Sequence, residues 1–278
     1  MKRSSAMINV KDIRLTPEEL DQCIDFARRS APTQQKIEFG SHDTKPRDPK
    51  EVARDNLIGK IAEVAFSKMM KANYGLDIPL YFEIYPRGKW DQQDALIHGW
   101  RIDVKGTRKG GRWMLVEWNK LNFRQREDRL SHVYVMFSVD WDRAADQPTG
   151  RASYEGAASL NKLRADCQTT RVLRKGEPIP GTHAILQADN YGILFRDLYK
   201  HLNHLVKYLQ ENEPPHSLTE NYPNPFTGQT TKQILAAINK PDKPAPAREA
   251  EAEVKAEAKP VVAEGLVARI KKLFGFNK

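Results

Sequence analysis

The run RIDVKGT at residues 101–107 carries a carboxylate and an ammonium in a pattern typical of a β-strand. Ile102 and Val104 alternate with Asp103 and Lys105, so the apolar side chains are expected on one face and the charged ones on the other. One interpretation is a solvated edge strand with a weak ion pair. The other is a site whose chemistry needs a carboxylate beside an ammonium.

A second carboxylate begins the preceding run DALI at residues 94–97. If His98 and Gly99 form the turn of a hairpin, Asp94 and Asp103 lie toward the same open end of it. Close carboxylates repel unless a proton or a cation lies between them, and Mg²⁺ is usually held by one or two carboxylates with waters and a phosphate. Lys105 would then orient or help deprotonate an attacking water, or hold the scissile phosphate. Asp91 is an alternative to Asp94 as the first acid.

A long helix predicted over residues 51–75 supplies a third acid. Glu63 lies beside an apolar stripe on this helix, where simple solvation is a poor explanation, and we expect it to point over the sheet edge toward the other carboxylates. Gly59, one turn earlier, weakens the helix by about 1 kcal/mol relative to alanine, which suggests close packing or a close approach at that position.

The order of a helix glutamate, a hairpin aspartate and an Asp-x-Lys strand resembles the PD-(D/E)XK nuclease superfamily. The resemblance covers residues 50–140 and implies a restriction-endonuclease-like core that hydrolyses phosphodiester bonds with Mg²⁺, with Mn²⁺ as the expected substitute. By this resemblance Asp94 and Asp103 bind the metal, Glu63 assists them, and Lys105 positions the water or the phosphate.

Positive charge is abundant near this pattern and across the chain. The loop after Lys105 contains Arg108, Lys109 and Arg112, which suit gripping a DNA backbone. The net charge of the 278 residues is +9, which favours a polyanionic partner such as nucleic acid or an anionic membrane surface. The histidines are expected to be structural: His98 in the hairpin turn, His132 in the core or at an edge, and His201 and His204 on a solvated helix face.

The elements that must position these residues follow a helix-helix-strands-helix order. Helices are predicted over residues 16–30, 51–75 and 190–213, and strands in IPLYFEIYP, DALI, WRIDVKGT, RWMLVEW and HVYVMFSVD, followed by a strand that enters a short helix in RASYEGAASLNKLR. We therefore expect an α/β or α+β fold with a mixed central β-sheet flanked by helices.

The composition divides the chain into three parts. Residues 1–240 are predicted to form the nuclease domain, 241–263 a disordered Pro/Ala/Glu/Lys linker, and 264–278 a short basic amphipathic segment suited to docking on a protein partner or a membrane surface. The two cysteines, Cys23 and Cys167, exclude a disulfide framework, and no apolar run or secretory signal is evident, so a cytoplasmic location is expected.

The function expected from the sequence is Mg²⁺-dependent endonucleolytic hydrolysis of DNA, in phage defence, phage biology or DNA processing, with a homodimer as a candidate assembly. The alternatives are a DNA-binding module without catalysis and an assembly adaptor, each retaining the same fold.

Overall fold

The computed structural model describes residues 7–34, 48–84, 93–117, 130–165 and 168–215, together with residue 218. The helices are α1 (Pro17–Gln34), α2 (Pro49–Tyr74), α4 (Leu160–Ala165) and α5 (Leu202–Glu211), with a 3₁₀ turn, η2 (Phe195–Asp197). The strands are β1 (Ile13–Arg14), β2 (Ala95–Ile97), β3 (Trp100–Arg108), β4 (Trp113–Glu117), β5 (Val133–Asp142), β6 (Gln147–Ser159), β7 (Thr170–Leu173) and β8 (Asn190–Leu194).

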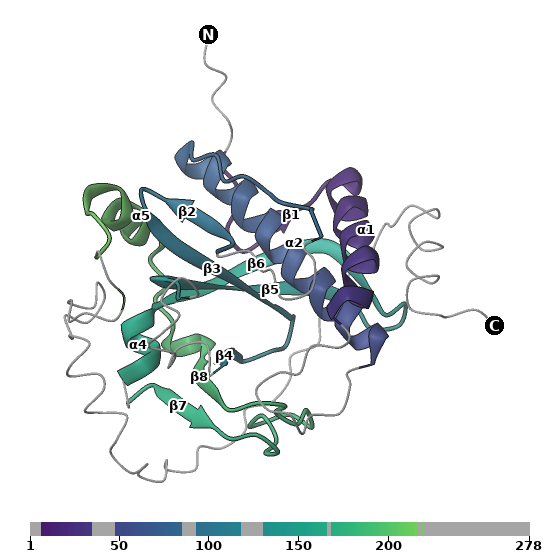
Figure 1. Ribbon diagram of the computed structural model, residues 1–278. Helices are drawn as coiled ribbons and strands as arrows, with labels where there is room; N and C mark the ends of the chain where they lie inside the picture. Colours follow the sequence, from purple (N-terminus) through teal and green to yellow (C-terminus); the bar gives the residue numbers. More distant parts are fainter. Residues whose placement is uncertain are drawn as a thin grey trace.

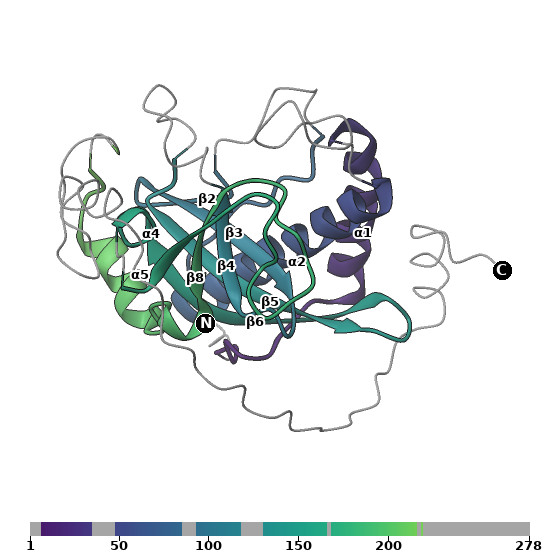
Figure 2. The same ribbon diagram turned by 90° about the horizontal axis from the view of Figure 1, so that it is seen from below.

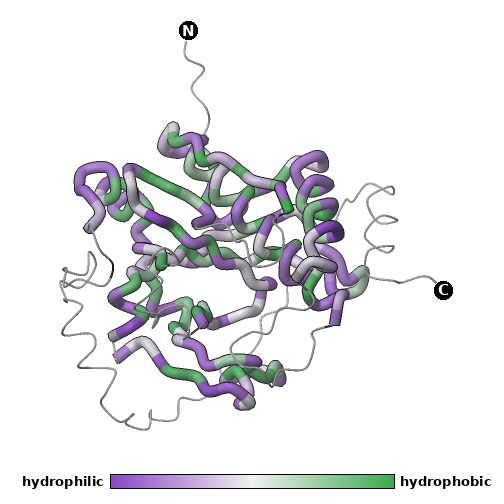
Figure 3. The backbone as a smooth tube through the Cα atoms, in the orientation of Figure 1, coloured by the Kyte–Doolittle hydropathy of each residue, from purple (hydrophilic) through white to green (hydrophobic). Residues whose placement is uncertain are grey.

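The start of α1 and the end of α2 follow the local signals that predicted them, whereas α1 continues through Pro32 to Gln34, beyond its predicted end at residue 30. Thr16 Oγ1 accepts a hydrogen bond from the backbone N–H of Glu19, whose carboxylate accepts one from the N–H of Thr16, and this reciprocal pair caps α1. Asp48 caps α2, which starts at Pro49, two residues before the predicted start, and ends at Tyr74, and Gly75 follows it as a C-cap in the left-handed conformation. Figure 3 shows the alternation of hydrophilic and hydrophobic residues along both helices.

A five-stranded mixed sheet in the order β1-β6-β5-β3-β2 forms the centre of the fold (Figures 1 and 2). Strands β3 and β5 are parallel, and the other neighbouring pairs are antiparallel. The predicted hairpin between β2 and β3 is confirmed: its two turn residues, His98 and Gly99, have φ of 47° and 83°. Positive φ at both positions is what the tight two-residue hairpin turn requires.

The main hydrophobic core lies between this sheet and helices α1 and α2. Trp100, Ile102 and Val104 of β3 are buried in it, as the alternation in the sequence predicted. Leu57, Ile61, Ala62, Ala65 and Met69 of α2 are among its other members, and four apolar residues of α5 (Leu202, Leu205, Val206 and Leu209) also belong to it.

The opposite face of the sheet is covered by a second sheet that the sequence did not predict, although two elements there were expected: the strand in RWMLVEW and the short helix in RASYEGAASLNKLR. A second, antiparallel sheet in the order β4-β8-β7 packs there with the short helix α4. Tyr134 and Met136 of β5 share this second core with Met114, Val116, Tyr191, Ile193, Leu160 and Leu163. The prediction of a mixed α/β fold is confirmed, but the expectation that helices flank the central sheet holds in full for one face only.

The strand predicted in IPLYFEIYP is wrong for its described part, residues 78–84, which form neither strand nor helix. The backbone carbonyls that a neighbouring strand would bond instead accept from side chains of α1 and α2. Ser67 donates to the carbonyl of Ile78, Lys60 to that of Tyr81, and Arg29 to that of Phe82. The segment therefore lies extended beside the two helices.

The helix predicted over residues 190–213 is correct only in its second half. Residues 190–194 form β8, because Tyr191 and Ile193 fill the second core and Gly192 lets neighbouring strands approach closely. A Cβ atom on Gly192 would lie 2.8 Å from Leu173 Cδ1 and 3.2 Å from Trp113 Cε3. The helix α5 begins only at Leu202.

The predicted linker and terminal amphipathic segment, residues 241–278, lie outside the described residues. Among the helices that the structure describes, none combines the length and the apolar character needed to cross a membrane.

Candidate active site

Asp103 and Lys105 lie side by side on β3, on the face turned away from α2. Their side chains form an ion pair, with Lys105 Nζ 2.6 Å from Asp103 Oδ1. The Lys105 side chain is 25% exposed, and the Asp103 side chain is 19% exposed. The register with β5 sets Asp103 beside Tyr134 and Lys105 beside Met136, two residues of the second core. The charged pair is therefore half-buried at the margin of that core, which does not fit a freely solvated edge strand.

Asp94 immediately precedes β2 and lies next to this pair. The pairing of Ala95 with Ile102, continued by one residue, sets Asp94 opposite Asp103. Asp94 Oδ2 accepts a hydrogen bond of 2.6 Å from the backbone N–H of Val104. Because β2 begins only at Ala95, the carboxylate of Asp94 takes the place of the strand partner that this N–H would otherwise have. The predicted meeting of the two acids at the open end of the hairpin is confirmed.

The charge on Asp94 is strongly disfavoured in this setting. Burial raises its pKa first, and the neighbouring carboxylates of Asp103 and Glu63 raise it further, to about 8; Lys105 and the N–H of Val104 act in the opposite direction. A buried carboxyl with excess negative charge around it is a group that a proton or a divalent cation would stabilise.

Lys105 keeps its proton in the same environment. Burial lowers the pKa of the ammonium, but the carboxylates of Asp103, Asp94 and Glu63 together outweigh burial and raise the pKa above its ordinary value. Lys105 is therefore a cation at neutral pH. Of the roles open to it, holding an anion or orienting a water by donating a hydrogen bond suits this charge state better than removing a proton.

Glu63 lies on α2, and its electrostatic influence on both Asp94 and Lys105 brings it into the same cluster. Its carboxylate also has a second partner, Lys60, whose Nζ is 2.5 Å from Glu63 Oε2. The Lys60 side chain is only 6% exposed, donates to the carbonyl of Tyr81, and has its Nζ 4.4 Å from the centroid of the Phe26 ring. Lys60 was not among the predicted site residues, although its spacing of three residues from Glu63 on a helix was a signal for this pair.

Gly106, and not Gly59, is the glycine at which α2 and β3 approach each other. A Cβ atom on Gly106 would lie 2.7 Å from the carbonyl oxygen of Ile58 and 3.1 Å from the Cβ of Ala62. A Cβ on Gly59 would meet no atom of the described structure within 4 Å, so the close packing expected there is wrong. The missing side chain of Gly106 sets the distance between the helix that carries Glu63 and the strand that carries Lys105.

The donor set fits a hard divalent cation better than a structural metal. No group of three or more His, Cys, Asp or Glu residues suited to a metal ion occurs among the described residues, and Asp91 lies outside them. Asp94 and Asp103 provide two carboxylates, and Mg²⁺ ordinarily takes one or two of these with waters and substrate phosphate. Burial and the neighbouring carboxylates of Asp103 and Glu63, which raise the pKa of Asp94, are the observation that agrees with such an ion.

The predicted backbone-gripping residues lie where β3 ends. The Arg108 guanidinium lies 5.8 Å from the centroid of the Trp141 ring, and Lys109 Nζ lies 3.4 Å from Asp140 Oδ1. The backbone N–H of Lys109 donates to the carbonyl of Val139, and the carbonyl of Arg112 accepts from Phe195. The loop is thus anchored at both ends while all three cationic side chains remain exposed.

The histidines have structural positions. His132 is buried, and its Nδ1 accepts from the backbone N–H of Arg101. His201 and His204 are exposed, and their rings stack with centroids 5.5 Å apart. These positions agree with the structural roles that the sequence predicted.

Comparison with protein-family models, with curated proteins and with solved structures yields no match to this chain.

Proposed function

We propose that the chain is a Mg²⁺-dependent nuclease that hydrolyses phosphodiester bonds in DNA, with a core of the restriction-endonuclease-like kind. The observation that carries the proposal is the cluster at the open end of the hairpin: Asp94 opposite Asp103, with Lys105 paired to Asp103 at 2.6 Å. Two carboxylates and a persistent ammonium at a half-buried sheet margin suit a phosphate and its metal ion.

Asp94 and Asp103 would hold the cation, which when bound polarises a phosphoryl oxygen and lowers the pKa of a coordinated water. Lys105 would donate a hydrogen bond to a non-bridging phosphate oxygen or to the attacking water. The water oxygen forms the new bond to phosphorus, the ester P–O bond breaks, and the leaving oxygen takes up a proton. Glu63, whose carboxylate is paired with Lys60, would assist Asp94 and Asp103 from its position on α2.

The proposal extends to substrate and setting. DNA is the expected substrate, Mn²⁺ the expected substitute for Mg²⁺, and phage defence, phage biology or DNA processing the expected context. Two copies of the chain would supply the two sites that cutting both strands of a duplex commonly needs.

A second candidate is a DNA-binding module without catalysis. The pairing of Glu63 with Lys60 favours it, because that contact competes with any role of Glu63 toward a metal ion. Both candidates predict binding of DNA, and only the first predicts cleavage.

The test is nicking of supercoiled plasmid by the purified chain with Mg²⁺ or with EDTA. Asp103→Asn and Lys105→Met remove the charge of each site residue with little change in size, and Lys71→Met is the matched control, since Lys71 forms an exposed ion pair with Asp77. The nuclease proposal predicts nicking that requires Mg²⁺, is lost in both site variants and is retained in the control. Nicking that survives in both site variants would refute it, and binding of DNA with no nicking would favour the second candidate.

A further inference from the structure

The face of the central sheet that carries Asp103 and Lys105 continues as a polar surface toward β1. Along β3 the same face presents Thr107, which pairs with Ser138 of β5. Ser138 in turn pairs with Ser153 of β6, and Arg151 of β6 pairs with Arg14 of β1. The candidate site is thus connected by hydroxyl and charged side chains to the opposite edge of the sheet.

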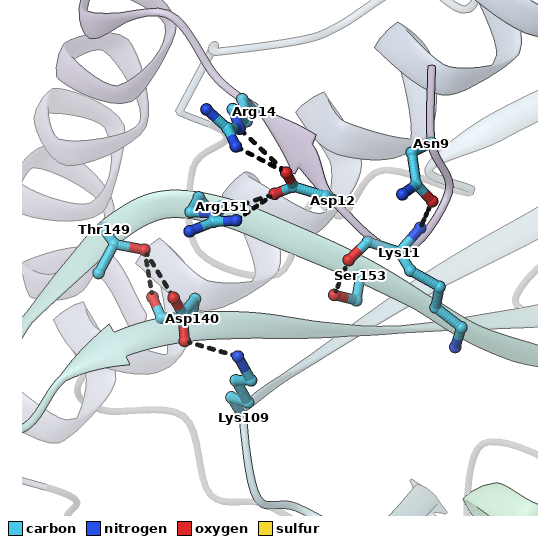
Figure 4. A network of polar contacts seen from close by, with 9 residues as sticks. All are labelled: Asn9, Lys11, Asp12, Arg14, Lys109, Asp140, Thr149, Arg151 and Ser153. Carbon is cyan, nitrogen blue, oxygen red and sulfur yellow. Dashed lines mark hydrogen bonds and ion pairs between the residues drawn. The ribbon is translucent and has the colours of Figure 1, made fainter. Parts of the chain in front are cut away.

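Four cations project from this surface: Lys11, Arg14, Lys109 and Arg151. Figure 4 shows Asp12 between Arg14 and Arg151, at 2.8 Å and 2.9 Å from their guanidinium nitrogens, and Lys109 directed toward Asp140. Lys11 forms the corresponding pair with Glu155 at 3.2 Å. We call these four residues the basic track.

The cations of the basic track lie above the carboxylates that pair with them. The four cationic side chains are between 46% and 69% exposed, whereas those of Asp12, Asp140 and Glu155 are between 21% and 30% exposed. The side-chain hydrogen bonds of Arg14 and Arg151 lower the pKa of Asp12 to about 2, so this carboxylate stays ionised and holds both guanidinium groups in place. The outermost layer of this surface therefore consists of cationic groups, and their carboxylate partners hold these groups in a fixed orientation.

The shape and composition of the track suit a sugar-phosphate backbone better than a lipid surface. The large apolar side chains that the described structure exposes are Met7, Tyr81, Leu96 and Ile185, and none lies on β1, β3, β5 or β6, the strands that the basic track crosses. A surface that enters a bilayer interface needs such side chains. From β3 to β1 the track crosses three strand spacings, about 14 Å, which corresponds to about four nucleotides of one strand.

We infer that the basic track binds the phosphates of the nucleic acid strand that enters the site at Lys105. The inference rests on the proposed function for the identity of the polyanion and for the direction of the strand. The contacts are to phosphates, so they position the substrate without reading its sequence. Lys109 joins the track to the site, since it follows Lys105 and Thr107 along the same strand face.

The test compares two triple variants that lose the same charge. The track variant is Lys11→Gln, Lys109→Gln and Arg151→Gln; the control variant is Arg28→Gln, Lys71→Gln and Lys207→Gln, three exposed cations that each pair with one carboxylate elsewhere on the molecule. Binding of a fluorescent 20-base-pair duplex is measured by anisotropy at several salt concentrations in EDTA. EDTA removes the divalent cation that the proposed cleavage needs, so the binding result does not depend on the chemistry.

The track variant should bind the duplex at least about tenfold more weakly, and its plot of log K against log salt should be less steep by about 0.9 for each phosphate that the variant no longer neutralises. The control should stay within about twofold of the unmodified chain. Equal weakening in both variants would mean that net charge alone attracts DNA, and no weakening in the track variant would mean that DNA binds elsewhere; either result overturns the inference. Loss of binding to phosphatidylserine vesicles with unchanged binding of DNA would also overturn it. Plasmid nicking with Mg²⁺ by the unmodified chain and the control variant tests the proposed nuclease activity separately, because neither of them lacks a residue of the site or of the track.

Discussion

Replacing Gly106 with alanine should destabilise the protein, because this position determines how closely α2 packs on β3. The added Cβ would lie 2.7 Å from the carbonyl oxygen of Ile58, well inside the 3.0 Å at which a neighbour must move. The neighbour here is helix backbone, which cannot rotate away as a side-chain tip could. Overpacking of this kind costs about 1–3 kcal/mol.

The matched control is Gly59→Ala on the same helix. Its Cβ would meet nothing within 4 Å in the described structure, and its backbone is helical, so alanine should stabilise the helix by about 1 kcal/mol. For a chain of this size a change of 1 kcal/mol shifts the melting temperature by about 2–4 °C. The two substitutions add the same atom to two glycines yet should move the stability in opposite directions.

The assay is urea unfolding followed by circular dichroism, supported by thermal melts. The expected order of midpoints is Gly59→Ala above the unmodified chain and Gly106→Ala below it. A Gly106→Ala variant as stable as the unmodified chain would show that α2 and β3 do not pack as described, and the position of Glu63 relative to Lys105 would then have to be reconsidered.

Two further predictions concern the charges of the site. Between the ordinary pKa of a free carboxyl, 3.8, and about 8, the folded chain keeps a proton on Asp94 that the unfolded chain has lost, so in EDTA this group should make stability fall as the pH rises through that range. Thermal melts of Asp94→Asn should show a smaller fall between pH 5 and pH 8, and a slope equal to that of the unmodified chain would contradict the raised pKa. Lys60→Met should lower the free energy of unfolding by about 3 kcal/mol, because it leaves the Glu63 carboxylate without its buried cation, and adding Glu63→Gln should recover much of the loss. A double variant no more stable than Lys60→Met in urea unfolding would show that Lys60 stabilises the fold by packing alone.

Local signals in the sequence predicted the parts of the fold that depend on neighbouring residues. The Thr16 cap, Gly75 and the His98-Gly99 turn each act over a few residues, so they could be identified without knowledge of the rest of the fold. The alternation through Asp103 and Lys105 likewise identified which side chains share a face, and the hairpin then brought Asp94 to them.

Long-range partners account for what the sequence did not predict. Residues 78–84 have the composition of a strand. Their carbonyls accept hydrogen bonds from side chains of α1 and α2 and not from a neighbouring strand. The helix over residues 190–213 is predicted from an apolar stripe that begins only at Phe195, and in residues 190–194 the second core takes Tyr191 and Ile193 at a spacing of two, as in a strand. The sequence contains one local signal of the basic track, the polar residues Arg151, Ser153 and Glu155 at alternate positions of β6. The pairing of β6 with β1, which brings Arg14 to Arg151, depends on the order of strands in the sheet.

The central claim is that Asp94 and Asp103 hold a divalent cation beside Lys105. The most direct measurement is titration of Mn²⁺ into the unmodified chain, Asp94→Asn, Asp103→Asn and the surface control Asp140→Asn, followed by isothermal calorimetry with and without a short phosphorothioate duplex. We expect saturable binding in the unmodified chain and in Asp140→Asn that is lost in both site variants. Equal binding by all four proteins, or no saturable binding by the unmodified chain even with the duplex present, would contradict the claim.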